Sequence, residues 1–142
     1  MSIHLTEHYD AIDWQILSDL YSAAGMGNKT PAQLETAFSN SLYCCFLHAA
    51  DGQLIGAGRA IGDGVLVAYL SDIAVHPAQQ GQGLGQRLVA HLMMKLQGHQ
   101  KILLYANPGK QDFYRRFGFR TMLTAMGRFE LADQARQRGF TD

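Results

Sequence analysis

The chain has 142 residues, with twelve basic and twelve acidic side chains that leave no formal net charge. Such a balance excludes partners held by bulk charge, so we expect no nucleic acid and no membrane surface as a partner. A chain of this length predicts one domain, residues 1–142. Its apolar runs have strand length, far below the roughly 20 residues of a membrane span. The N-terminus has no signal-peptide pattern, and we therefore expect a cytoplasmic protein.

The N-terminal third predicts a short strand and two helices. Residues 3–7 favour the strand, and a helical period of apolar residues follows over residues 13–25. The second helix has a clear start, with Thr30 as N-cap, Pro31 at the first helical position and Gln33 completing a capping box.

The next segment predicts a β-hairpin. Residues 43–49 and 54–61 read as strands, and Asp51–Gly52 reads as the turn between them. Cys44 and Cys45 are adjacent and therefore face opposite sides of the first strand. They indicate neither a disulfide framework nor a metal site, and buried thiols are favoured over a catalytic cysteine.

The middle of the chain predicts a strand, a helix and a second strand. Residues 65–75 are apolar on both faces over much of their length, as in a central strand. An apolar stripe over residues 84–96 predicts a helix that ends near Gly98. Residues 101–106 predict a buried strand, parallel to the previous one if the helix is a crossover.

The C-terminal part predicts a short helix and further strands. The helix spans about residues 111–116, and one or two strands are expected within residues 121–131. The polar residues 133–142 are expected to fray. Six histidines lie scattered without ligand spacing, so we expect no metal.

A glycine-rich turn joins the central strand to the following helix. Gly81, Gly83 and Gly85 leave backbone N–H groups uncovered by side chains, and the helix adds the unpaired N–H groups of its first turn. Together with the helix dipole these groups predict a phosphate or pyrophosphate site. The spacing fits neither the dinucleotide fingerprint nor a Walker loop.

Two motifs resemble one known family. Gln80-x-x-Gly83-x-Gly85, after a strand that ends in Val75–His76–Pro77, resembles the acyl-CoA pyrophosphate loop of the GNAT N-acetyltransferase superfamily. Residues 113–119, Phe-Tyr-Arg-Arg-Phe-Gly-Phe, are similar to the family's Tyr-x-x-x-Gly-Phe. The resemblance spans roughly Asp13 to Leu131. It implies an α/β (α+β) fold: a central mixed, mostly antiparallel sheet with a parallel splayed central strand pair, flanked by helices.

The resemblance also implies acetyl-CoA as cosubstrate. Amides of the glycine turn would bind the pyrophosphate, and the main chain of the central strand would pair with pantetheine. The implied cofactor-binding residues are Ile73, Val75, Gln80, Gly81, Gln82, Gly83, Leu84, Gly85, Gln86, Asn107 and Tyr114. Asn107 is equally well explained as a turn residue before Pro108. Many family members have a small residue three positions after this asparagine, where this chain has Lys110. This difference weakens the assignment of the family's role to Asn107.

The candidate catalytic residues are Tyr114, which the resemblance implies, and Asp72, which lies on the central strand one residue before Ile73. Tyr114 resembles the family's general acid, although an aromatic anchor on a short helix is the alternative. Asp72 is a candidate general base, acting directly or through water, and His76 is a weaker one. Both have ordinary structural explanations as well, and ordered water can replace a side-chain base.

The sequence thus predicts an N-acetyltransferase that moves acetyl from acetyl-CoA to a primary amine by direct attack in a ternary complex. The alternative is a non-catalytic acyl-CoA sensor or regulatory module. The acceptor is a small-molecule or peptide amine, and a homodimer is plausible because strand edges are exposed. The loop over residues 25–29 is either a specificity loop, as the resemblance implies, or an ordinary connection.

Overall fold

The computed structural model describes residues 2–142, which fall into two compact units, one ending at Leu104 and one beginning at Tyr105. The single domain expected over residues 1–142 stays a prediction. Among the described residues, no helix combines the length and the apolar character needed to cross a membrane.

The first unit is built on one mixed sheet of five strands. In sheet order they are β1 (His4–Thr6), β2 (Tyr43–His48), β3 (Leu54–Gly62), β4 (Val67–Val75) and β5 (Lys101–Leu103). Neighbouring strands pair antiparallel except β4 and β5, which are parallel and are joined through the helix α3 (Leu84–Lys95). This arrangement confirms the predicted fold class.

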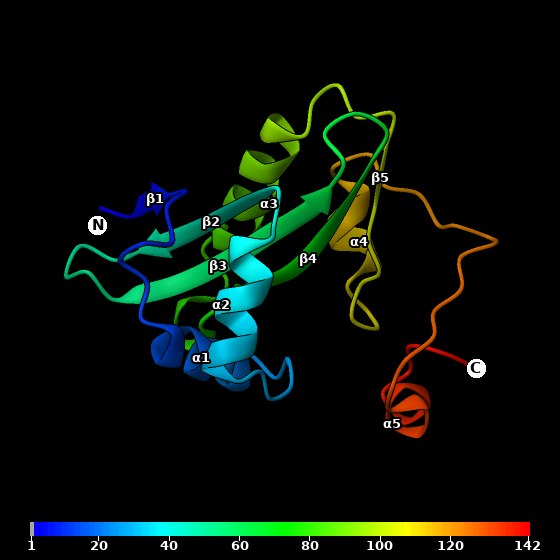
Figure 1. Ribbon diagram of the computed structural model, residues 1–142, viewed down its shortest axis with the longest axis horizontal. Coiled ribbons are helices and arrows are strands. Elements are labelled where there is room, and N and C mark those ends of the chain that lie inside the picture. The colour runs from blue at the N-terminus through cyan, green and yellow to red at the C-terminus, as the bar shows by residue number, and fades with distance from the viewer. Residues whose placement is uncertain (1) are drawn as a thin grey trace. The chain divides into compact units, whose positions relative to one another are not determined.

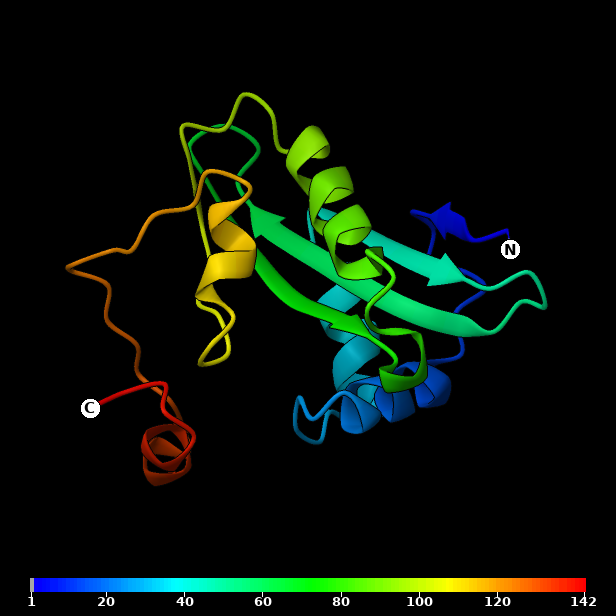
Figure 2. The same cartoon turned by 180° about the vertical axis from the view of Figure 1, so that it is seen from behind.

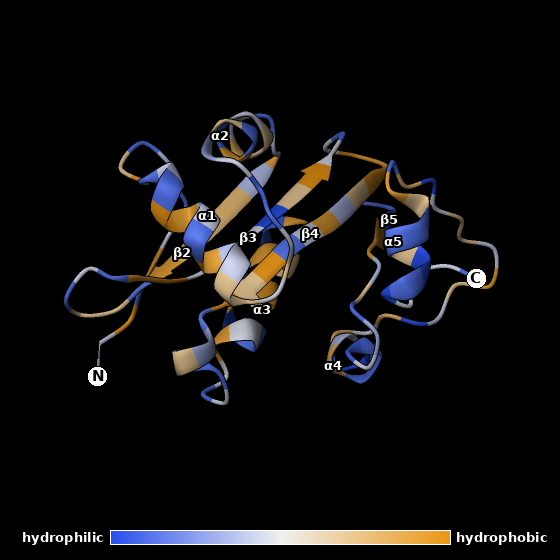
Figure 3. Cartoon of the chain, turned by 90° about the horizontal axis from the view of Figure 1, so that it is seen from below, coloured by the Kyte–Doolittle hydropathy of each residue, from blue (hydrophilic) through white to orange (hydrophobic). Residues whose placement is uncertain are grey.

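Helices cover both faces of the sheet. The helices α1 (Trp14–Ala23) and α2 (Pro31–Ser39) lie in front of the sheet in Figure 1, and α3 lies behind it, which Figure 2 shows from the other side. Hydrophobic colours run along β3 and β4 between these layers (Figure 3). On the α1 and α2 side the core includes the fully or almost fully buried side chains of Leu17, Leu20, Tyr21, Leu34, Phe38 and Phe46.

The first two helices begin at capped residues. The Asp13 carboxylate accepts hydrogen bonds from the N–H groups of Gln15 and Ile16, at 2.9 and 3.3 Å. At α2 the Thr30 hydroxyl accepts from the N–H of Gln33, and the Gln33 side chain accepts from the N–H of Thr30. The predicted capping box is therefore confirmed.

The strand β4 contains a bulge. Ala74 pairs with Ala57 and Ser71 pairs with Arg59, so two residues of β4 stand opposite Gly58 alone. One of the two is Asp72, whose φ of 57° makes it the only non-glycine residue with a positive φ in the described part of the chain. The bulge lies in the second half of β4.

The strands β4 and β5 part after three paired residues. Their ladder ends where Tyr69 pairs with Leu103, while β4 continues to Val75. This is the splayed pair of the predicted fold. Both strands are shorter than predicted. The strand β5 ends at Leu103. The strand β4 begins only at Val67, because the Asp63 carboxylate accepts hydrogen bonds from the N–H groups of residues 65–67 and holds the start of the predicted strand in a turn.

The second unit contains two short helices, α4 (Gln111–Arg115) and α5 (Ala132–Gln137). The helix predicted over residues 111–116 is confirmed to within one residue. The strands predicted within residues 121–131 are wrong, since the described residues of this unit form no strand. Within the polar end that was expected to fray, residues Ala132–Gln137 form α5.

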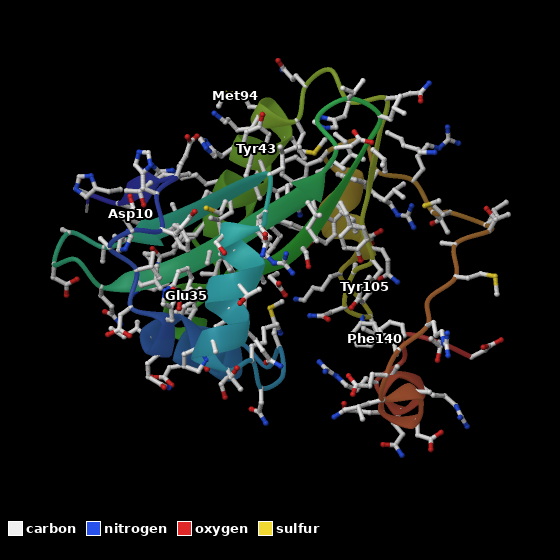
Figure 4. All side chains as sticks on the ribbon, in the orientation of Figure 1. Asp10, Glu35, Tyr43, Met94, Tyr105 and Phe140 are labelled. Atoms are coloured by element: carbon white, nitrogen blue, oxygen red, sulfur yellow. The ribbon has the colours of Figure 1, made fainter. Side chains whose placement is uncertain are left out.

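A small aromatic cluster lies in the second unit. The rings of Tyr105 and Phe140 meet edge to face at 5.4 Å and lie side by side in Figure 4. Phe129 contacts both rings, and Ala135 of α5 is 5% exposed. These contacts place apolar side chains on both sides of α5 in the sequence, within the unit that contains it.

The capping box yields a stability prediction. Thr30→Ala removes the acceptor for the Gln33 N–H and should lower the free energy of unfolding by about 1 kcal/mol, measured by urea denaturation. Glu35→Ala, at an exposed position of the same helix (Figure 4), is the control and should change it far less. Equal effects of the two changes would contradict the capping role.

Candidate functional site

The turn after β4 is tied back to the strand. Residues Pro77–Gln79 form a short 3-10 turn, η1, in which the Nδ1 atom of His76 accepts from the N–H of Ala78 at 3.1 Å. The side-chain amide of Gln80 donates to the Val75 carbonyl, also at 3.1 Å. The end of the strand and the start of the glycine turn are therefore fixed relative to each other.

The glycine turn requires glycine for conformational reasons. Gly81 and Gly83 have φ values of 83° and 79°, in the left-handed region that side chains disfavour. A Cβ atom added to either residue would meet no atom of the chain within 4 Å. The space beside this main chain is open, so a ligand can approach it closely.

The helix α3 begins at this turn without a capping side chain. Gly83 is the N-cap residue, and its carbonyl accepts the first helical hydrogen bond, from the N–H of Arg87 at 3.1 Å. The N–H groups of Leu84, Gly85 and Gln86 have no acceptor within the helix, as in the first turn of any helix. With the positive end of the helix dipole they suit a phosphate group. The residues present therefore fit the diphosphate of a coenzyme.

The open edge of β4 lies just before this turn. Val75 pairs with Gly56 of β3, but β5 pairs with β4 only as far as Tyr69. The main chain of Ile73 and Val75 therefore lies in the part of β4 that has no strand partner on its β5 side. An extended ligand can add to such an edge as a further strand.

The Asp72 carboxylate at the bulge has two cationic neighbours. Its Oδ2 atom accepts from Nε of Arg59 at 2.7 Å, and its Oδ1 atom lies 3.9 Å from Nζ of Lys29. The side chains of Asp72 and Arg59 are 14% and 15% exposed, so solvent screens this pair only partly. The Asp72 carbonyl accepts from the Tyr21 hydroxyl at 2.7 Å.

Sequence reasoning missed Arg59 and Tyr21, and it included Lys29 only as part of the candidate specificity loop over residues 25–29. Arg59 is the only charged residue in an otherwise apolar and glycine-rich strand, and such an isolated charge could have indicated a buried partner. Tyr21 follows Leu17 by four residues and lies on the same apolar helix face, so nothing in the sequence distinguishes it from an ordinary core residue.

Tyr114 and Asn107 belong to the second unit. The Tyr114 ring, on α4, contacts Phe113 at 5.0 Å and Phe119 at 6.1 Å, and burial raises the pKa of its phenol. The Asn107 carbonyl accepts from the N–H of Lys110 at 2.9 Å, which closes a turn. Of the predicted site residues, Ile73, Val75 and residues 80–86 are brought together in the first unit.

The bulged strand β4 thus separates from its parallel neighbour and leads into a glycine turn and the uncapped start of α3. The family model described as "Acetyltransferase (GNAT) family" matches residues 11–119. The chain therefore belongs to the GNAT acetyltransferase family, as the sequence motifs indicated.

Curated relatives and solved structures agree with this family. The chain is 32% identical over 108 residues to an uncharacterized N-acetyltransferase ycf52-like of Prochlorococcus marinus, covering 72% of this chain and 60% of the relative. It is also 32% identical to the chloroplastic serotonin N-acetyltransferase 2 of Oryza sativa, covering 76% of this chain and 56% of the relative. The chain thus spans somewhat more than half the length of these relatives.

A crystal structure from Staphylococcus aureus, described as a probable acetyltransferase of unknown function, is 30% identical to this chain with a TM-score of 0.80. The match covers 92% of this chain and 98% of that one.

The described residues contain no group of three or more His, Cys, Asp or Glu side chains that could hold a metal ion. Cys44 and Cys45 are free and buried. Burial raises the pKa of the Cys44 thiol to about 11 and that of the Cys45 thiol to about 12. Neither thiol has the lowered pKa of an activated nucleophile.

These thiols yield a reactivity prediction. A rise in the pKa of Cys44 from 9.0 to about 11 lowers the thiolate fraction at pH 8 about a hundredfold. Native protein should therefore react with iodoacetamide at least that much more slowly than protein unfolded in guanidinium, with a rate that increases with pH. Mass spectrometry of alkylated peptides measures both rates. One rapidly alkylated thiol in the native protein at pH 8 would contradict this prediction and support a catalytic cysteine.

Proposed function

We propose that this protein is an N-acetyltransferase that moves acetyl from acetyl-CoA to a primary amine by direct attack in a ternary complex. The observation that supports it best is the bulged, half-unpaired strand β4 leading into the uncapped start of α3. The amine and the donor react directly, since neither cysteine is activated as a covalent nucleophile.

In this proposal the chain binds acetyl-CoA mainly through its backbone. Main-chain N–H groups of residues 81–86 contact the diphosphate, with Gln80 holding the turn against Val75. The main chain of Ile73 and Val75 pairs with the pantetheine, and an amide near Ile73 faces the thioester oxygen. Asn107 is also proposed to contact the cofactor. No metal is required by these roles.

Asp72 is proposed to receive the proton that the amine must lose, directly or through an ordered water. A primary amine with a pKa of about 10.4 is mostly protonated at neutral pH, so a nearby carboxylate helps to attract and deprotonate it. The structure adds a detail to this proposal: Oδ2 of Asp72 is occupied by Arg59, so Oδ1, beside Lys29, is the oxygen that would act.

The acceptor is proposed to be a small-molecule amine or a peptide amine. The name of the Oryza sativa relative, a serotonin N-acetyltransferase, supports a small amine. That relative is chloroplastic, whereas the location proposed for this protein is the cytoplasm. A homodimer is also proposed, since β1 and β5 are the edges of the sheet.

An amine panel with thiol release as readout tests this function. The proposed enzyme releases CoA from acetyl-CoA only when a suitable amine is present. Calorimetry on the same protein measures acetyl-CoA binding independently. Tight binding with no acceptor-dependent release would favour the non-catalytic acyl-CoA sensor. No binding of either acetyl-CoA or CoA to folded protein would contradict both functions.

The glycine turn yields a binding prediction. Gly83→Val places a β-branched side chain at a φ of 79° and should raise the dissociation constant of acetyl-CoA about tenfold or more, because the strained turn moves its amides. Isothermal calorimetry measures the change, and circular dichroism checks the fold. Gln82→Ala is the matched control, since it removes a side chain and keeps the main chain. If both variants bind acetyl-CoA equally well, the turn does not bind the diphosphate.

Tyr114 yields a turnover prediction. Tyr114→Phe should lower kcat by up to roughly 10²-fold, the lower range for general acid catalysis, because a thiolate can leave even without a proton. Burial raises the pKa of Tyr114, so its phenol stays protonated above its ordinary range, and its contribution should be lost only as pH rises through that raised value. Tyr105→Phe, at another tyrosine of the second unit, is the control. A kcat for Tyr114→Phe equal to the wild-type value across pH would leave only the aromatic anchor role.

A further inference from the structure

Asp72 adopts a backbone conformation that is uncommon for residues other than glycine. Its φ is 57°, in the left-handed region, and it stands in the middle of a strand at the register shift with β3. Side chains rarely adopt this conformation, which persists only where surrounding contacts fix it. Two residues, Tyr21 and Arg59, supply such contacts to Asp72.

Tyr21 makes the contact with the main chain. It lies on α1, 51 positions earlier in the sequence, and its hydroxyl donates to the Asp72 carbonyl oxygen at 2.7 Å. The side chain is fully buried and packs beside Phe38, with ring centroids 6.5 Å apart. Burial, with Asp72 nearby, raises the pKa of the Tyr21 phenol well above its ordinary value, so the hydroxyl stays a donor.

Arg59 makes the contact with the side chain. Its Nε donates to Oδ2 of Asp72 at 2.7 Å, its Nη1 lies 3.4 Å from the Ser41 hydroxyl, and its guanidinium carbon lies 5.9 Å from the centre of the Phe38 ring. Asp72 is thus held at two points, by its carboxylate and by its carbonyl. These points come from β3 and from α1.

The carbonyl contact has a consequence for the next residue. The C=O of Asp72 and the N–H of Ile73 belong to one planar peptide group, and no cis peptide bond occurs in the described chain. In a trans peptide the two bonds point in opposite directions. Fixing the Asp72 carbonyl therefore also fixes the direction of the Ile73 N–H.

We propose that Tyr21 is a positioning residue that orients the Ile73 amide at the reacting end of the acyl-CoA site. This inference rests on the proposed function, in which an amide near Ile73 faces the thioester oxygen. A preoriented N–H stabilises the negative charge that develops on this oxygen during acyl transfer, and it does so without reorganising in the transition state. Tyr21 is fully buried and therefore acts on the reaction only through the Asp72–Ile73 peptide.

The test is Tyr21→Phe, which removes the hydroxyl and keeps the ring. We expect kcat for amine-dependent CoA release to fall about tenfold, the equivalent of one lost hydrogen bond. The KM for acetyl-CoA should stay within about threefold of the wild-type value, because the glycine turn is unchanged. Leu34→Ala controls for lost stability, since Leu34 is buried in the same core cluster and is 2% exposed. Tyr43→Phe controls for loss of a hydroxyl elsewhere (Figure 4).

Residual dipolar couplings measured by NMR provide a readout without turnover. They report the direction of each N–H bond, and Tyr21→Phe should change the coupling of Ile73 more than those of β2 and β3, whereas Leu34→Ala should not single out Ile73. An unchanged Ile73 coupling overturns the proposal whatever the activity. So does a kcat no lower than that of Leu34→Ala. A wild-type protein that releases no CoA with any amine instead overturns the proposed function, and the couplings then decide the orientation by Tyr21 separately.

Discussion

The bulge at Asp72 is the constraint on which the site depends. The strand β4 must pair with β3 along almost its whole length and yet separate from β5 after Tyr69. An extra residue opposite Gly58 permits this, since a bulge bends the strand and increases its twist. A left-handed, non-glycine residue costs on the order of 1–3 kcal/mol. Hydrogen bonds from Arg59 and Tyr21 to Asp72 offset that cost. The bond from Arg59 is charge-assisted, and such a bond contributes about 1.5–3 kcal/mol.

The two charges that stabilise the bulge depend on each other. The side chains of Arg59 and Asp72 are mostly buried, and the Arg59 guanidinium lies against the Phe38 ring. An unpaired charge is costly in such a place. Replacing only one of them therefore leaves the other charge poorly solvated in the core. An aspartate at this position thus serves the fold whether or not it also receives a proton, and a loss of activity in an Asp72 variant cannot by itself identify a general base. Turnover must be read together with the folding stability of the variant.

The features that were predictable from the sequence are the local ones. The capping box from Thr30 to Gln33 and the glycine turn at Gly81 and Gly83 depend on residues within a few positions of each other, and the chain order of strand, turn and helix follows from hydrophobic periodicity. The contact between Tyr21 and Asp72 joins residues 51 positions apart, and no local pattern encodes it. Within residues 121–131 only the last four alternate between polar and apolar side chains, and a strand also needs a neighbour, which a local pattern cannot supply.

The same strand also sets the spacing of the proposed site. Asp72 and Val75 are three residues apart on β4, and at about 3.3 Å per residue a strand spans at most about 10 Å between the bulge and the start of the turn. Gln80 then fastens the turn to the Val75 carbonyl. A ligand that contacts both the Ile73 amide and the amides at the start of α3 must therefore have a fixed length between its reactive group and its anion. One residue inserted between Ile73 and Val75 would lengthen this span and turn the following side chains to the other face of the sheet. The distance between the two ends of the site is thus a property of the strand register, which the bulge and its contacts with Arg59 and Tyr21 maintain.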